Sequence, residues 1–145
     1  MYKIYTDGSC IQGDAKHENH LAGGWGAIVI DPQGSETEYS GHQSGTTNIR
    51  MELVAVGRSL KDGIPWGAEV EIHHDYTGIS KWLTREWKRK DPDVIKLCAG
   101  IEKIIHDRGL KVSFVHVKGH SGDTMNERVD KLASAACKDG ISKRS

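Results

Sequence analysis

The sequence lacks the features that would mark a membrane protein, a disulfide-bonded protein or a strongly basic one. None of its apolar runs approaches the roughly 20 residues of a membrane span. Residues 1–5 pass directly into a strand-like pattern without the apolar region of a signal peptide. Lys plus Arg and Asp plus Glu number 20 each, so the formal net charge is zero. This balance argues against a histone-like or tail-driven nucleic-acid binder, but it allows a local basic strip.

Cysteine is also scarce. Cys10, Cys98 and Cys137 are odd in number and far apart, which fits neither a disulfide framework nor the paired spacing of a zinc site. Reduced thiols favour a cytoplasmic protein. The length of 145 residues and the absence of repeats, low-complexity runs and linkers predict one globular domain. We expect this domain over residues 1–140 and a frayed polar tail over residues 141–145.

Hydrophobic periodicity predicts nine elements in the order β-β-β-α-β-α-α-β-α. Strands are expected over residues 3–6, 25–30, 36–42, 69–74 and 111–117. Helices are expected from Thr47-Asn48 to Gly63, over residues 77–90, from Asp91-Pro92 to Gly109, and from a capping box at Thr124-x-x-Glu127 onward. A meander followed by strand–helix alternation predicts an α/β fold, with a five-stranded mixed sheet and helices on both faces.

Four acidic residues occupy notable positions in this layout. We expect Asp7 to end the first strand and Asp75 the fourth, and ligands gather beyond the carboxyl ends of strands in open α/β sheets. Glu52 lies beside the apolar stripe of the first helix, and Asp130 lies beside that of the last helix. Taken singly, each acid is more often a cap or a solvated side chain, and Asp7 could simply cap the turn that follows it.

Convergence of these carboxylates would demand cations. Two unit charges about 4 Å apart repel by about 4 kcal/mol at an effective dielectric constant of about 20. Ligands that are all oxygen favour Mg²⁺ or Mn²⁺ over Zn²⁺. Two such ions about 4 Å apart are a template for phosphodiester hydrolysis. Spacing alone does not establish that the four residues meet.

Five sequence strings narrow these alternatives. They are Tyr5-Thr6-Asp7-Gly8-Ser9-Cys10, Thr47-Asn48-x-Arg50-Met51-Glu52-Leu53, Asp75 after a strand, Gly119-His120-Ser121-Gly122, and Asn126-Glu127-Arg128-Val129-Asp130-x-Leu132-Ala133. In this order they resemble the type 1 ribonuclease H family over about residues 2–138. The resemblance implies a ribonuclease H-like fold. It also implies hydrolysis of the RNA strand of RNA–DNA hybrids, which leaves 5′-phosphate and 3′-hydroxyl ends.

The resemblance also implies roles for individual residues. It implies that two Mg²⁺ ions, or Mn²⁺ as a substitute, are held by Asp7, Glu52, Asp75 and Asp130. His120 matches a mobile histidine suited to proton transfer or product release, although an isolated loop histidine would be read as a surface residue. Glu127 matches a secondary acid near one metal ion.

The resemblance also implies two contacts with the substrate. Thr47 matches a residue that binds a phosphate of the DNA strand, and Asn48 matches one that contacts the minor groove. Both begin a helix, where free N–H groups favour phosphate, and plain helix capping is the alternative. Discrimination between RNA and DNA would rest on 2′-hydroxyl contacts and duplex shape.

The sequence departs from the familiar family pattern in three places. The loop over residues 11–24 is long and contains His17 and His20, which we interpret as a solvated loop rather than a metal site; Asn19 is a weak candidate for the minor groove. Asp75 is followed by Tyr76-Thr77-Gly78-Ile79, which resembles a variant branch of the family.

The third departure is a short basic strip over residues 81–90 in place of the family's basic protrusion. We expect Lys88, Arg89 and Lys90 to help hold DNA phosphates with salt-dependent affinity. Trp82 and Trp87 are expected to be core or partly buried residues, not platforms for base stacking.

Two other classes of function are considered. A hybrid-binding module without catalysis would be signalled by loss of one of the four carboxylates, and none is lost. A DNA-cutting relative, such as an integrase or junction resolvase, would lack the Gly119–Gly122 string and the matched Thr47-Asn48 pair. We expect a monomer that has no obligate protein partner and no membrane association.

Overall fold

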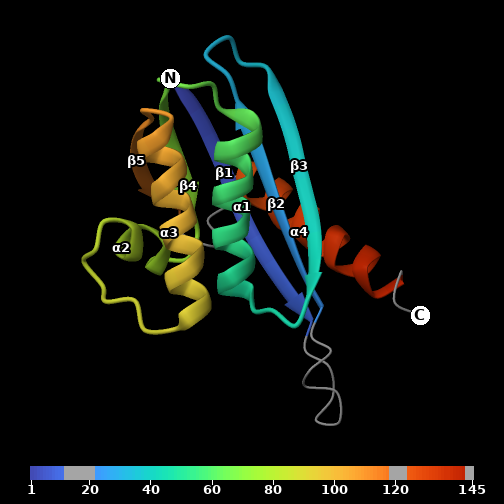
Figure 1. The fold of residues 1–145 in the computed structure, drawn as a ribbon. Helices are drawn as coiled ribbons and strands as arrows, with labels where there is room; N and C mark the ends of the chain where they lie inside the picture. The colour runs from blue at the N-terminus through green and yellow to red at the C-terminus, as the bar shows by residue number, and fades with distance from the viewer. Residues whose placement is uncertain (12–21, 118–123, 143–145) are drawn as a thin grey trace.

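The computed structural model describes residues 1–11, 22–117 and 124–142, and its elements follow the predicted order (Figure 1). The strands are β1 (Tyr2–Ile11), β2 (Ala22–Ile30), β3 (Glu36–Ser44), β4 (Glu69–His74) and β5 (Lys111–His116). The helices are α1 (Asn48–Gly63), α2 (Gly78–Leu83), α3 (Pro92–Asp107) and α4 (Thr124–Ser142). Helix α4 thus extends two residues into the segment expected to be a tail.

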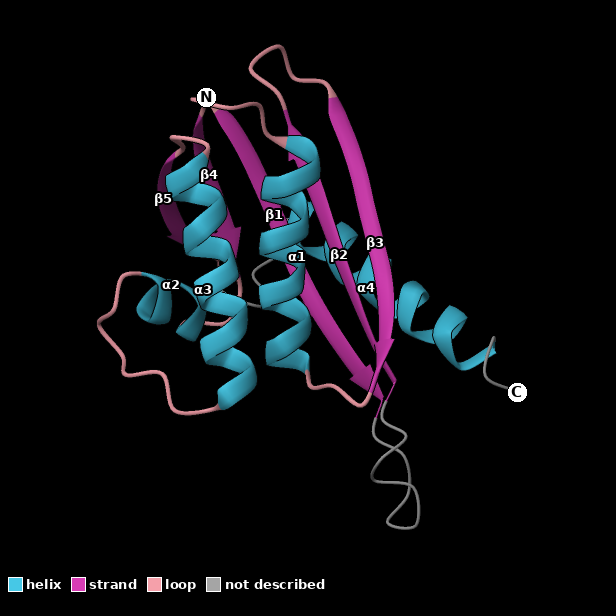
Figure 2. Ribbon diagram, in the orientation of Figure 1, coloured by secondary structure: helices cyan, strands magenta, loops and turns pink. Residues whose placement is uncertain are grey.

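The five strands form one mixed sheet in the order β3-β2-β1-β4-β5. Strands β1, β2 and β3 pair antiparallel, whereas β1, β4 and β5 pair parallel. Helices α1 and α3 cover one face of the sheet and α4 covers the other (Figure 2). The α/β architecture predicted from the sequence is therefore confirmed.

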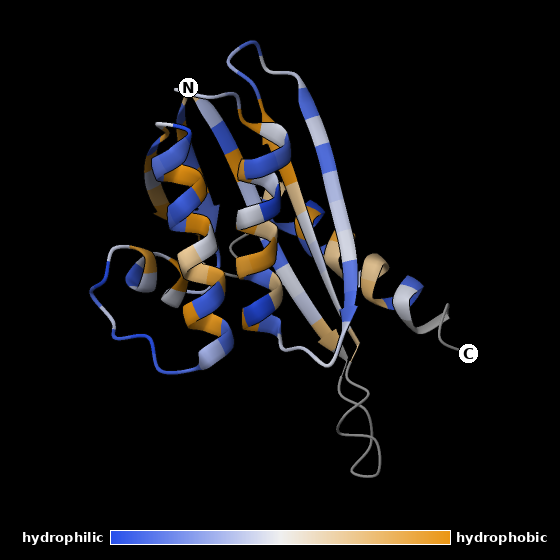
Figure 3. Ribbon diagram, in the orientation of Figure 1, coloured by the Kyte–Doolittle hydropathy of each residue, from blue (hydrophilic) through white to orange (hydrophobic). Residues whose placement is uncertain are grey.

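Burial follows from these layers. Strand β2 is covered on both faces, so nearly all of its residues are buried, whereas the edge strand β3 is polar and exposed (Figure 3). Helix α1 buries Met51, Leu53, Val56 and Leu60 against the sheet. Each such side chain contributes about 1.5–3 kcal/mol by leaving water. The core thus holds α1 rigidly beside β1, which matters for the site described below.

Two predicted elements have different lengths in the structure. Strand β1 does not end at Asp7, because antiparallel pairing with β2 continues from Asp7↔Gly26 to Ile11↔Ala22. The helix expected over residues 77–90 ends at Leu83, because Arg85 adopts a left-handed conformation with φ 64° and the chain leaves the helix there. Among the described residues, no helix combines the length and apolarity needed to cross a membrane.

Candidate active site

Asp7 and Asp75 become neighbours through the parallel register of β1 and β4. Tyr5 pairs with His73, and β4 ends one residue later at His74. Asp75 therefore follows the carboxyl end of β4 at the level where β1 continues through Asp7. Asp7 lies in the middle of its strand, so the site is at the centre of the sheet and not beyond the end of β1.

Two glycines let helices approach this point from opposite faces. A Cβ on Gly8 would lie 2.5 Å from the carbonyl oxygen of Asn48 and 2.6 Å from the amide nitrogen of Glu52, both on α1. Gly26 faces Asp7 across the β1–β2 ladder, and a Cβ there would lie 2.9 Å from the carbonyl oxygen of Val129 on α4. These approaches place Glu52 and Asp130 on either side of Asp7.

The pKa of Asp7 reflects this close packing of carboxylates. Burial, together with the nearby charges of Asp130 and Asp75, raises its pKa from 3.8 to about 7, against the opposing effect of the Gly8 amide. The Gly8 N–H donates to Asp7 Oδ1 at 2.9 Å. Asp7 also shares a hydrogen bond with Asp130. Two carboxyl groups form such a bond only if one of them carries a proton, and the raised pKa of Asp7 makes Asp7 the proton carrier.

Glu52 is the most buried acid of the site, with 5% of its surface exposed. Burial raises its pKa from 4.5 to about 8, and the charges of Asp7 and Asp75 add to this rise. The Tyr76 N–H donates to Glu52 Oε1 at 3.4 Å and partly opposes it. The Asp75 backbone N–H also opposes the rise, and a carboxylate buried with only these two amides as compensation favours a bound cation.

Two histidines that the sequence analysis did not single out hold the turn after β4. His74, 1% exposed, donates from Nδ1 to the Tyr76 carbonyl oxygen at 2.9 Å. His116 on β5 donates from Nε2 to the Asp75 carbonyl oxygen at 2.7 Å. Burial lowers the pKa of His74, so its neutral form is favoured. The His73-His74 pair directly before Asp75 was the signal available in the sequence.

The remaining expected site residues are placed as follows. Thr47 caps α1 by accepting the Arg50 N–H at 3.2 Å, and both Thr47 and Asn48 are exposed at that helix start. Glu127 is exposed one helical turn before Asp130 on α4, so the two lie on the same edge of that helix. His120, His17, His20 and Asn19 lie outside the described residues.

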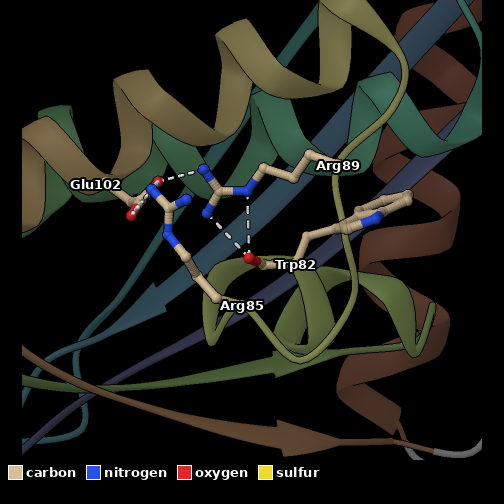
Figure 4. Close-up of polar contacts among 4 residues, drawn as sticks. All are labelled: Trp82, Arg85, Arg89 and Glu102. Atoms are coloured by element: carbon tan, nitrogen blue, oxygen red, sulfur yellow. Dashed lines mark hydrogen bonds and ion pairs between the residues drawn. The ribbon is translucent and has the colours of Figure 1, made fainter.

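The basic strip differs from the expectation at Arg89. Its side chain is 8% exposed, and its guanidinium forms an ion pair with Glu102 of α3 and donates to the Trp82 carbonyl oxygen at 2.9 Å (Figure 4). Arg85 also pairs with Glu102, and Lys81 pairs with Glu86. The expectation that Arg89 holds DNA phosphates is therefore corrected, because its charge is buried and already neutralised.

Lys88 and Lys90 keep their charges available, since neither forms an ion pair within the described part of the chain. The aromatic residues of the strip divide in two. Trp82 is partly buried and packs on Tyr76, with ring centroids 5.6 Å apart. Trp87 is 43% exposed, which corrects the expectation of a more buried side chain, and meets Trp82 only edge-on at 6.2 Å.

The donor set of the site suits a hard divalent cation. All four candidate ligands are carboxylates, and the burial and repulsion that raise the pKa of Asp7 are both offset by a bound cation. Within residues 1–11, 22–117 and 124–142, no three His, Cys, Asp or Glu side chains are close enough together to hold one metal ion among them. Mg²⁺ ordinarily uses one or two carboxylates together with substrate phosphate and water, so an open arrangement fits it.

A sheet in the order β3-β2-β1-β4-β5, with a carboxylate cluster at its centre, defines the class of ribonuclease H-like hydrolases. The family model described as RNase H matches residues 1–138, and the chain belongs to this family of hydrolases. The resemblance seen in the sequence motifs is thereby confirmed.

Individual relatives agree with this assignment. The chain is 38% identical to a ribonuclease H of Novosphingobium aromaticivorans, over 92% of this chain and 94% of the relative. It is 34% identical to a ribonuclease H of Hahella chejuensis, over 96% and 95%. Among solved structures, LC11-RNase H1 in complex with RNA/DNA hybrid is 28% identical, with a TM-score of 0.79, over 97% of this chain and 99% of that one.

Proposed function

We propose that this chain hydrolyses the RNA strand of RNA–DNA hybrids at Asp7, Glu52, Asp75 and Asp130, with two Mg²⁺ ions as cofactors and 5′-phosphate and 3′-hydroxyl products. The observation that carries the proposal is the convergence of Asp7 with Asp130 and Asp75 beside the buried Glu52. Membership of the ribonuclease H family supports the reaction. The hybrid complex of LC11-RNase H1 supports the substrate class.

When bound, the ions would activate the attacking water and stabilise the leaving oxygen. The protein's own contribution is to hold its carboxylates in place. The Gly8 N–H orients Asp7, and the Tyr76 N–H orients Glu52. His74 anchors the backbone carbonyl of Tyr76, and His116 anchors that of Asp75. Asp7 and Glu52, whose pKa values are raised, would release their protons when they hold a cation.

Proton transfer and secondary acid chemistry rest on the motif resemblance alone. His120 is proposed as the proton shuttle or the aid to product release, because an imidazole titrates near neutral pH. Glu127 is proposed as a secondary acid, and its place one turn before Asp130 supports that role.

Substrate binding is proposed at two surfaces. The exposed Thr47 and Asn48 stand at the N-terminus of α1, where backbone N–H groups favour a phosphate. Lys88 and Lys90 supply exposed positive charge that can track the DNA backbone. The free thiols Cys98 and Cys137, both buried, fit a reducing cytoplasm, and we propose that the enzyme acts there as a monomer.

The decisive experiment compares labelled RNA–DNA hybrid, double-stranded RNA and double-stranded DNA in parallel reactions with Mg²⁺, Mn²⁺ or chelator. The expected result is cleavage of the hybrid's RNA strand alone, abolished by chelator. Sensitivity of the products to phosphatase and ligase identifies their ends. Cleavage of duplex DNA would point to a DNA-cutting relative, and binding without cleavage would point to a hybrid-binding module.

A further inference from the structure

A groove of about 620 Å³ separates α1 from α3, away from the carboxylate cluster. The two helices lie side by side and run in the same direction (Figure 1). The groove's floor is largely apolar and includes Leu53 and Val54 of α1 and Leu97, Ile101 and Ile104 of α3. Each helix has 16 residues, so the walls are about 24 Å long.

Two glycines keep this groove open, although the helices would have room for a larger residue at both positions. Gly57 of α1 and Gly100 of α3 both line it from helix interiors, where glycine costs about 1 kcal/mol relative to alanine. A Cβ on Gly100 would meet no heavy atom within 4 Å, and one on Gly57 would meet only Ile101 Cγ1 at 3.4 Å. Neither glycine is needed for close helix packing, unlike Gly8.

The walls of the groove are positively charged. Its lining includes four basic residues, Arg50, Arg58, Lys61 and Lys96, and one acid, Asp93. Arg50 is paired with Asp93 and with Asp91, and Arg58 lies 3.4 Å from Asp62. Within the described ranges, Lys61 on one wall and Lys96 on the other form no ion pair. The groove therefore offers unneutralised positive charge on both sides of an apolar floor.

We propose that this groove docks an acidic peptide segment of a partner protein. Apolar side chains of the segment would cover the floor, and its carboxylates would face Lys61 and Lys96. A nucleic-acid backbone matches the charge but would leave the apolar floor exposed to water. A second copy of this chain matches poorly, because a symmetric contact would bring the same two lysines against their own counterparts.

The test begins with selection of random displayed peptides on the whole protein. Selected sequences are expected to place several Asp or Glu residues around large apolar ones. A synthesised selected peptide is then titrated against Gly100→Leu, which fills the groove, and against Lys61→Glu/Lys96→Glu, which reverses its charge. Each variant should raise the Kd at least about tenfold. Lys103→Glu, an exposed α3 position that does not line the groove, should leave the Kd within about twofold.

Hybrid cleavage and thermal denaturation are measured on the same variants, and both should be retained. The docking proposal is independent of the proposed catalysis, because peptide affinity and cleavage are separate readouts. The proposal is overturned if no acidic and apolar consensus emerges, or if the peptide binds Gly100→Leu as tightly as the wild type. Concentration-dependent dimerisation that Gly100→Leu abolishes would also overturn it, since the occupant would then be a second copy.

Discussion

The Arg89 guanidinium lies between the carboxylate of Glu102 on α3 and the carbonyl oxygen of Trp82 on α2 (Figure 4). The ion pair of Arg89 with Glu102 holds the basic segment after α2 against α3. Because Arg85 reaches the same carboxylate, Glu102 serves two guanidinium groups. Arg89 therefore has a structural role, which the basic sequence of the strip does not reveal.

Removal of the shared carboxylate should therefore destabilise the protein. We expect Glu102→Gln to lower the free energy of unfolding by about 1–3 kcal/mol, because Arg89 stays buried without a charged partner. Urea denaturation measures this change. Arg89→Lys should also lower stability. The planar guanidinium donates to the carboxylate and the carbonyl at once, and the compact ammonium of lysine cannot replace both contacts. Lys103→Ala on the same helix is the control, and a wild-type stability for Glu102→Gln would contradict the assignment.

Charge reversal at the two exposed lysines should weaken substrate binding. For Lys88→Glu/Lys90→Glu we expect a higher KM for hybrid and a shallower dependence of KM on salt, because fewer counterions are released on binding. The turnover number should change little. Lys103→Glu reverses the charge of one exposed lysine outside the strip and serves as a control. Unaltered KM and salt dependence would show that this strip does not contact the hybrid.

Asp7→Asn should separate catalysis from binding. We expect at least a thousandfold loss of turnover, about 4 kcal/mol in activation free energy, while hybrid affinity persists. The cause is loss of the central carboxylate that contacts Asp130 and repels Asp75. Asp62→Asn, at the far end of α1, is a matched control. Retained turnover in Asp7→Asn would refute its assignment as a metal ligand.

The stability of the metal-free protein should fall as pH rises from about 5 to about 9. The pKa values of Asp7 and Glu52 rise to about 7 and about 8 in the folded state, from ordinary values of 3.8 and 4.5. The folded protein therefore holds protons that the unfolded chain has released, and loses this stabilisation as pH passes those folded values. The expected slope is at most about 1.4 kcal/mol per pH unit for each proton.

Chemical denaturation across this pH range, with chelator and with Mg²⁺, measures the effect. Excess Mg²⁺ should flatten the dependence, because bound cations replace the protons. Glu52→Gln should remove much of the slope between about pH 7 and 9. A metal-free stability that rises with pH over this range would contradict the burial of these acids.

A matched pair of glycine substitutions tests the approach of α1 to β1. Gly8→Ala places a Cβ 2.5 Å from the Asn48 carbonyl oxygen, so α1 must shift. We expect a loss of about 1–3 kcal/mol in stability and weaker Mg²⁺ affinity, because Glu52 moves with the helix. Gly100→Ala meets no neighbour and should stabilise by up to about 1 kcal/mol with normal cleavage. Unchanged stability and Mg²⁺ affinity in Gly8→Ala would show that the close approach is not needed.

Local signals in the sequence determined much of the molecule. The strand pattern over residues 69–74 and the caps at Thr47 and Asp91 appear in the structure as predicted. These features depend on neighbours a few residues apart, which the sequence displays directly. The motif strings likewise singled out the four carboxylates that we propose as the active site.

Tertiary contacts decided the rest. Strand β1 continues past Asp7 because it pairs with β2 as far as Ile11. Helix α2 ends early, and the segment after it is held by the contacts of Arg89 with Trp82 and Glu102. The same holds for the raised pKa values and for the groove between α1 and α3. Each of these features depends on which residues contact one another in the folded chain. Those contacts set the burial and the local charge of each group, and the spacing of residues along the sequence does not reveal them.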